Sequence, residues 1–264
     1  MNQDDDGQVE TSSEALNDRQ LALLALVQGK GFATVEWLTE RFEVSAQTIR
    51  RDIIRLDECG LLQRFHGGAG AIESTVRLGY AQKQGVAVDA KVTIGRAAAA
   101  LVPEGATVFL DVGTTVESAA RVLAGHRALR VFTNSLASAM HLAGRPGIDV
   151  IVTGGSVRGA DGSLVGEGAT ALLRDLRLDL ALIGLSGWDE DGAPMDFDLD
   201  KIAVKRIAIA RSAQAVALCD AGKFARMAVA RIAPVEAFST VVCDRPPPDP
   251  LRRLIEQKGI SIVS

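Results

Sequence analysis

The chain has 264 residues, which is enough for one large domain or for a small domain followed by a medium one. Apolar residues make up 47% and aromatic residues only 4%, so a sizeable core can form, and an α/β protein is favoured over an all-β sandwich. The net charge of −4 argues against nucleic-acid binding through bulk electrostatics, so a DNA site must depend on where individual arginines lie.

The start of the chain and its cysteines indicate where the protein works. The first 18 residues are polar and acidic, which predicts a disordered tail rather than a signal peptide. No apolar run approaches the ~18–20 residues needed to cross a bilayer. Cys59, Cys219 and Cys243 are too scattered for a disulfide framework or a zinc site. We therefore expect a cytoplasmic protein with no membrane contact, no metal and no cofactor.

Three short helices and a hairpin are predicted over residues 19–73. After the first helix, Thr34 is placed to cap a second, and Ser45 caps a third that runs to Gly60. Residues 61–71 read as a strand, a glycine turn and a return strand. Two helices joined by a tight turn and followed by a β-hairpin are typical of a winged helix-turn-helix, which binds DNA.

The third helix is amphipathic. At about 100° per residue, Ile49 and Ile53 share a buried face, while the opposite face carries an amide and several arginines. Arginine can bond two acceptors on a guanine edge or clamp a phosphate, and glutamine can read adenine. The predicted DNA contacts are Ser45, Gln47, Thr48, Arg50, Arg51 and Arg55 of this helix, with Arg64 and His66 of the wing. Periodicity alone is equally compatible with a solvated helix that carries scattered charge.

A different pattern follows an expected linker over residues 74–90. Short β-rich runs alternate with alanine-rich helical stretches across residues 91–264. The predicted strands are 106–112, 129–133, 148–154, 178–184, 215–220, 239–244 and 260–263. The predicted helices are 91–102, 115–124, 135–144, 200–212 and 250–258. This alternation is typical of a doubly wound, mostly parallel sheet, so the fold class is α/β.

Polar and glycine-rich turns follow five of these strands. Ligands of open α/β sheets bind beyond the carboxyl ends of the strands. The turn at 113–115 precedes a helix, and its backbone N–H groups and hydroxyls suit a phosphate. Lys223 can complement the phosphate charge, and nearby carboxylates and an amide can bond the hydroxyls of a sugar or polyol. The predicted ligand contacts are Asp111, Gly113, Thr114, Thr115, Thr133, Asn134, Gly154, Gly155, Asp220 and Lys223.

Several motifs are shared with a known family. The run SAQTIRRDI (45–53) with the wing RFHGGA (64–69), and the later stretches DVGTT, VFTNS, TGGSVR and CDAGKF, resemble the DeoR family of repressors. The resemblance covers both predicted domains. Within the helix, Asp52 is expected to pair with a neighbouring arginine, because a carboxylate is repelled by DNA phosphates.

The resemblance implies a repressor of a carbohydrate or polyol catabolic operon. DeoR-family sensor domains resemble sugar-phosphate isomerases that have lost catalysis, and their effectors are phosphorylated sugars or polyols that relieve repression. Residues 123–136 and 183–208 are most similar to the glycerol-3-phosphate branch of the family. The expected partners are therefore double-stranded operator DNA and a phosphorylated effector such as glycerol 3-phosphate, and no catalytic residue is assigned.

Two alternatives remain open at this stage. The protein can be the same kind of regulator with a different sugar phosphate as its effector, or a sugar-phosphate isomerase-like enzyme fused to a DNA-binding domain. Dinucleotide binding is disfavoured because no G-x-G-x-x-G follows the first strand.

We also expect a homo-oligomer, a dimer or tetramer, since a single winged helix buries too little surface for operator affinity.

Overall fold

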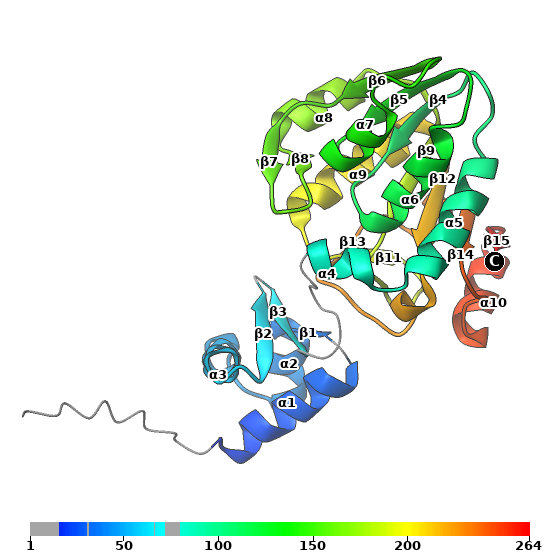
Figure 1. The fold of residues 1–264 in the computed structure, drawn as a ribbon. Helices are drawn as coiled ribbons and strands as arrows, with labels where there is room; N and C mark the ends of the chain where they lie inside the picture. Colours follow the sequence, from blue (N-terminus) through cyan, green and yellow to red (C-terminus); the bar gives the residue numbers. More distant parts are fainter. Residues whose placement is uncertain (1–15, 31, 66, 72–79) are drawn as a thin grey trace, which may run out of the picture.

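The computed structural model describes residues 16–30, 32–65, 67–71 and 80–264 (Figure 1). Most of the expected N-terminal tail and His66 lie outside these ranges, as do residues 72–79, which span the end of the predicted winged domain and the first part of the expected linker. The described chain forms a small N-terminal domain and a larger C-terminal domain. No helix within the described ranges is both long and apolar enough to span a membrane.

The N-terminal domain is a winged helix-turn-helix, as the sequence predicts. Its elements are α1 (Asp18–Lys30), β1 (Phe32–Thr34), α2 (Val35–Phe42), α3 (Ala46–Glu58), β2 (Leu62–Phe65) and β3 (Gly68–Ala71). The three strands form an antiparallel sheet in the order β1-β3-β2. Both predicted caps are present: Thr34 Oγ1 accepts from Trp37 N–H at 3.1 Å, and Ser45 Oγ accepts from Thr48 N–H at 3.2 Å.

The core of this domain holds α3 in place. Ile49, Ile53 and Leu56 are buried, as expected, in one cluster with side chains of α1 and α2. Asp52 is also buried, and it accepts from Arg19 Nε of α1 at 2.6 Å. The ion pair gives the carboxylate the expected structural role, but its partner is an arginine of α1 rather than a neighbouring one, so it links α3 to α1.

The C-terminal domain is built on one seven-stranded parallel sheet. Its strands are β4 (Thr107–Leu110), β5 (Leu129–Thr133), β6 (Ile148–Val152), β9 (Leu178–Gly184), β12 (Ser212–Cys219), β14 (Thr240–Cys243) and β15 (Ser261–Val263). Their order is β15-β14-β12-β9-β4-β5-β6. All seven correspond to predicted strands, and every pairing is parallel.

Helices cover both faces of this sheet (Figure 1). One face packs against α5 (Val88–Ala100), α6 (Thr114–Leu123) and α7 (Leu136–Leu142). The other packs against α8 (Glu167–Arg174), α9 (Leu199–Arg211) and α10 (Asp249–Gln257). The sequence predicts all of these except α8. Within the expected linker, the structure has the short helix α4 (Tyr80–Gly85) and the first turn of α5.

Two small sheets sit beside the main one. The strands β7 (Ser156–Arg158) and β8 (Ser163–Val165) form a hairpin. The strands β10 (Gly187–Trp188), β11 (Pro194–Asp196) and β13 (Ala230–Arg231) form a three-stranded antiparallel sheet. Two 3₁₀ turns, η1 (Ala221–Lys223) and η2 (Val235–Ala237), complete the domain. None of these short elements is predicted from the sequence.

The strand order places a ligand crevice between β4 and β9. From β4 the chain builds outward through β5 and β6, then returns to the other side of β4 as β9 and continues to β12. At such a reversal the two following loops diverge, which leaves a crevice at the carboxyl ends of the two central strands.

Helices α5 and α6 pack unusually closely at Gly95. A Cβ built on Gly95 would lie 2.6 Å from the backbone carbonyl carbon of Ser118, closer than any real contact of this kind. The alanine-rich sequence of α5 and this glycine therefore set the distance between the two helices, and α6 is the helix that begins at the crevice.

We predict that Gly95→Ala destabilises the C-terminal domain by about 1–2 kcal/mol, because overpacking against rigid backbone costs about 2–3 kcal/mol and the ~1 kcal/mol that alanine gains over glycine in a helix offsets only part of it. Urea unfolding checks this. Gly125→Ala is the control, since its Cβ would meet only the carbonyl oxygen of Val122 at 3.5 Å. Equal stability of both variants would contradict the packing argument.

Candidate functional site

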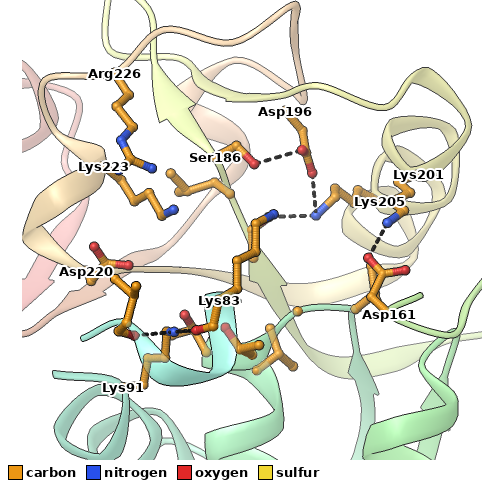
Figure 2. A pocket seen from close by; sticks show the side chains of 18 residues that line it. Lys83, Lys91, Asp161, Ser186, Asp196, Lys201, Lys205, Asp220, Lys223 and Arg226 are labelled. Atoms are coloured by element: carbon orange, nitrogen blue, oxygen red, sulfur yellow. Dashed lines mark hydrogen bonds and ion pairs between the residues drawn. The ribbon is translucent and has the colours of Figure 1, made fainter. Parts of the chain in front are cut away.

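A cavity of about 110 Å³ occupies the crevice between β4 and β9. It is lined by the turns that follow β4, β9 and β12, together with residues of α4, α5, α9 and β11. An adjoining cavity of about 360 Å³ extends it and shares seven lining residues with it. The shared residues are Lys83, Gly113, Thr114, Asp161, Ser186, Asp196 and Lys201. The two cavities thus form one site, shown in part in Figure 2.

The first turn of α6 forms one wall. Gly113 has φ +132°, a backbone conformation that favours glycine, and from there the chain turns directly into the helix. No side chain caps this helix, and Gly113, Thr114 and Thr115 all line the cavity. The first N–H groups of a helix carry partial positive charge, so this wall favours an anion.

The lining of the first cavity contains six cationic side chains and three carboxylates. Figure 2 shows them in two groups. At one end, Lys201 pairs with Asp161, and Lys205 pairs with Asp196. At the other end, the carboxylate of Asp220 lies beside Lys91, Lys223 and Arg226, while the ammonium group of Lys83 extends between the two groups. Within the cavity lining, cations therefore outnumber carboxylates at this end.

Lys205 forms the floor of the end where lysines pair with carboxylates, which we call the balanced end. It is 1% exposed, and its Nζ donates to Asp111, to the Gly184 carbonyl at 2.7 Å and to Asp196 Oδ2 at 3.1 Å. Burial alone lowers the pKa of Lys205, but the charges of Asp111 and Asp196 outweigh this effect and raise the pKa above its ordinary value. The paired carboxylates thus favour the charged form of Lys205, which ties α9 to the ends of β4, β9 and β11.

Burial and neighbouring charges act on the lysines of the cationic end. Burial lowers the pKa of Lys223 to about 8, and the charges of Arg226, Lys83 and Lys91 act in the same direction against the opposing effect of Asp220. Burial also lowers the pKa of Lys91, whose Nζ donates to the carbonyls of Lys83 and Val86. An anion placed among these groups would raise their pKa values and favour their charged forms.

Helix α4 brings the segment between the domains into this site. Lys83 lines both cavities, and Tyr80 lines the second. The Tyr80 hydroxyl donates to Glu117 Oε2 of α6 at 2.9 Å, and burial raises the pKa of Glu117. The described part of the expected linker is therefore a wall of the site rather than a spacer.

Half of the sequence-predicted ligand contacts lie in the cavity lining. These are Gly113, Thr114, Thr115, Asp220 and Lys223. Asp111 lies one layer below, where it accepts from Lys205 and from Gly184 N–H at 3.0 Å.

The structure places the other four predicted contacts outside the lining of both cavities. Thr133 Oγ1 donates to the Leu110 carbonyl at 2.7 Å, and Asn134 Nδ2 donates to the Leu164 carbonyl at 3.4 Å. Gly154 and Gly155 have positive φ, and a Cβ on Gly155 would lie 2.4 Å from the Val165 carbonyl oxygen. These residues shape the neighbouring turns.

Sequence reasoning missed most of the charged lining. Lys205 had a detectable signal, because it lies on a helix face with Ile202 and Ile209, where an unpaired lysine is costly. Lys83 and Lys91 lie in the expected linker and at the start of the following helix, and no local pattern marks them. Arg226 follows an irregular turn, so only the tertiary structure brings it to the site.

The predicted DNA contacts lie on α3 and the wing. Gln47, Arg50 and Arg51 are exposed, on the helix face away from the core, while Ser45 and Thr48 lie at its N-terminus with their hydroxyls 2.9 Å apart. Arg55 is half-buried, and Arg64 is exposed on β2. The geometry thus gathers the arginines of α3 at a single accessible surface, which is the arrangement by which a recognition helix enters a major groove.

Comparison with known proteins agrees with this two-domain structure. Residues 19–75 match the DeoR-like helix-turn-helix domain, and residues 86–245 match the DeoR C-terminal sensor domain. The chain is 34% identical over 244 residues to the glycerol-3-phosphate regulon repressor of Escherichia coli (strain K12), which covers 92% of this chain and 97% of that one. It is also 34% identical to the HTH-type transcriptional repressor CsqR of the same organism, over 94% of this chain and 95% of that one.

Among solved structures, ribose 5-phosphate isomerase A from Methanocaldococcus jannaschii aligns with 52% of this chain and 54% of its own, at a TM-score of 0.39 and 17% identity. The matches to both domains and to full-length relatives cover nearly all of the described chain. The chain belongs to the DeoR family of transcriptional regulators.

Proposed function

We propose that this repressor is released from its operator by a phosphorylated sugar or polyol that binds in the crevice between β4 and β9. The observation that carries the proposal is the cationic end of the cavity, where Lys91, Lys223 and Arg226 lie around one carboxylate beside the N-terminus of α6. A phosphate binds well to such cations and to the first N–H groups of a helix.

The opposite end of the site suits hydroxyl groups. Ser186 Oγ donates to Asp196 Oδ1 at 2.9 Å, and the carboxylates of Asp161 and Asp196 are held by Lys201 and Lys205. Fixed carboxylates accept hydrogen bonds from sugar or polyol hydroxyls, whereas a second phosphate would be repelled by them. The effector we propose therefore has one anionic end and one hydroxyl-bearing end.

Glycerol 3-phosphate is our first candidate for this effector. It has the required chemistry, and one of the relatives is named for the glycerol-3-phosphate regulon. CsqR is equally identical to this chain and carries no such name, so another sugar phosphate is the alternative. A thermal-shift panel decides between them: stabilisation by fructose or galactitol phosphates without any response to glycerol 3-phosphate would reject the first candidate.

Release requires a difference in affinity between two states of the protein. The effector must bind more tightly to an arrangement of the domains that does not fit the operator, and operator DNA must then weaken effector binding by the same factor. We infer that α3 enters a major groove through Gln47, Arg50 and Arg51, and that two or more copies of the chain bind paired half-sites. Operator titrations with and without effector test this reciprocity.

We further infer that the sensor domain binds its effector without transforming it, and that the protein works in the cytoplasm. Of the histidines in the described chain, neither His126 nor His141 lines the cavity, so neither is placed as a general base there. Turnover of a sugar phosphate by the pure protein, detected by NMR above the uncatalysed rate, would overturn the inference about catalysis.

Removing one recognition-helix arginine tests the DNA face. Arg51→Ala should weaken operator binding by about 1–3 kcal/mol, roughly fivefold to 150-fold, because a base or phosphate contact is lost. Fluorescence anisotropy with labelled operator measures this, and calorimetry should show unchanged effector binding. Arg211→Ala, at an exposed position on α9, is the matched control. Equal operator affinity of the two variants would remove Arg51 from the interface.

Removing the cavity lysine tests the anion site. Lys223→Met should weaken effector binding by about 1.5–3 kcal/mol, roughly tenfold to 150-fold, because a hydrogen bond to a charged group is lost. Operator binding without effector should stay unchanged. Lys258→Met, whose side chain pairs with Glu236 far from the cavity, is the control. Titration calorimetry is the measurement, and undiminished affinity in Lys223→Met would place the phosphate elsewhere.

Effector affinity should fall as the pH rises above about 8. The pKa of Lys223 is lowered to about 8 in the empty site, and a bound phosphate raises it. Binding above pH 8 therefore requires proton uptake, and the dissociation constant should increase toward about tenfold for each pH unit. Calorimetry between pH 7 and 9.5 in buffers of different ionisation enthalpy checks both effects. The Lys223→Met variant should lose this pH dependence; its persistence there would assign the proton to another group.

A further inference from the structure

Among the described residues, two contacts between the DNA-binding domain and the sensor domain reach the same small sheet. Phe32 of β1 stacks edge to face on Phe197, with ring centroids 5.5 Å apart and an interplanar angle of 75°. Gly67, in the turn between the wing strands, faces Val229, because a Cβ there would lie 3.4 Å from Val229 Cγ1. Phe197 directly follows β11, and Val229 directly precedes β13.

Phe32 is buried in an unusual place. It is 1% exposed, yet it lies outside the apolar cluster that forms the core of the winged helix. Its ring packs instead against Phe197 and across Gly68, where a Cβ would lie 2.8 Å from the ring. A large apolar side chain that is buried against another domain, rather than in the core of its own, stabilises the interface between the two domains. We call the contacts Phe32–Phe197 and Gly67–Val229 the seam.

Residues at or next to each strand of the β10-β11-β13 sheet line the cavity. Ser186, which lines the cavity, immediately precedes β10, and Asp196, which also lines it, is the last residue of β11. Arg226 lines the cavity three residues before Val229, and its carbonyl accepts from Trp188 N–H of β10 at 2.7 Å. Every strand of the sheet therefore begins or ends near a group that faces the effector site.

Phe197 connects the two sides directly. It lines the second cavity and also stacks on Phe32, so one side chain touches both the effector site and the DNA-binding domain. Its backbone is held at both ends: Asp196 Oδ1 accepts from Phe197 N–H at 2.7 Å, and Asp198 caps α9 while pairing with Arg158. In Figure 1 the β1–β3 sheet is turned toward β11 and β13 of the sensor domain.

We propose that the seam transmits effector binding to the DNA-binding domain: an effector that shifts Ser186, Asp196 or Arg226 moves the small sheet, and with it the wing. This inference rests on the proposed function, because it names the path by which an occupied crevice changes operator affinity. Coupling requires an element whose arrangement both sites bias, and the three-stranded sheet is in contact with both sites.

The test weakens the seam at residues that do not line either cavity. The double variant Phe32→Leu/Val229→Ala removes the ring contact from one side and the Gly67 contact from the other, and thermal unfolding verifies that it folds. Leu21→Ala, which removes an exposed apolar side chain of α1, is the matched control. Effector binding is measured by calorimetry with glycerol 3-phosphate and the phosphates of the panel, and operator affinity by anisotropy with and without effector.

The wild type and the control should show operator binding weakened by effector within the usual range of about fivefold to 150-fold. The double variant should bind effector as well as the wild type does, within about twofold, but its operator affinity should change less than threefold on addition of effector. A full response in the double variant would overturn the seam while leaving the proposed function intact. If no effector weakens operator binding of the wild type, the proposed function fails, and the transmission path fails with it.

A covalent link gives a second, independent readout. Gly67→Cys/Val229→Cys in a Cys59→Ser background should form a disulfide on mild oxidation, since the two positions face each other and the remaining cysteines are buried. The oxidised protein should still bind effector, but its operator affinity should no longer respond, and reduction should restore the response. Failure of the disulfide to form, or a response that is unchanged after oxidation, would contradict the seam.

Discussion

A single ammonium group sealed from solvent organises the sensor domain. Lys205 is held by Asp111 at the end of β4, the Gly184 carbonyl at the end of β9 and Asp196 at the end of β11. An unpaired charge at this depth would cost several kcal/mol, so the three strand ends must stay together around it. This requirement fixes the floor of the crevice and the starting points of the loops that form its walls.

The charge distribution of the site follows from that arrangement. Because Lys205 and Lys201 are neutralised by carboxylates, the balanced end offers fixed acceptors, while cations outnumber carboxylates in the lining around Asp220. The two ends suit the two chemical halves of a phosphorylated polyol. The same carboxylate that pairs with Lys205 precedes Phe197, so the floor of the site and the contact with the DNA-binding domain belong to one continuous segment.

The regular elements were predictable because their signals are local. Alternation of apolar strands and alanine-rich helices gave all seven strands of the main sheet, and caps at Thr34 and Ser45 placed the helices of the winged domain. The short strands β10, β11 and β13 were not predicted, since runs of two or three residues leave no periodicity to read. Helix α4 was missed for the same reason, and with it the contribution of Lys83 to the site.

The sequence by itself determined the two domains, the arginine-bearing helix and the glycine–threonine turn at the start of α6, because motifs and periodicity are properties of neighbouring residues. Only the tertiary structure decided which polar groups share a cavity. Thr133 and Asn134 follow a strand just as Gly113 does, but β5 lies beyond the reversal between β4 and β9, so their side chains bond backbone carbonyls instead. Lys83, Lys205 and Arg226 meet because the strand order brings distant segments together, and no local sequence pattern encodes that order.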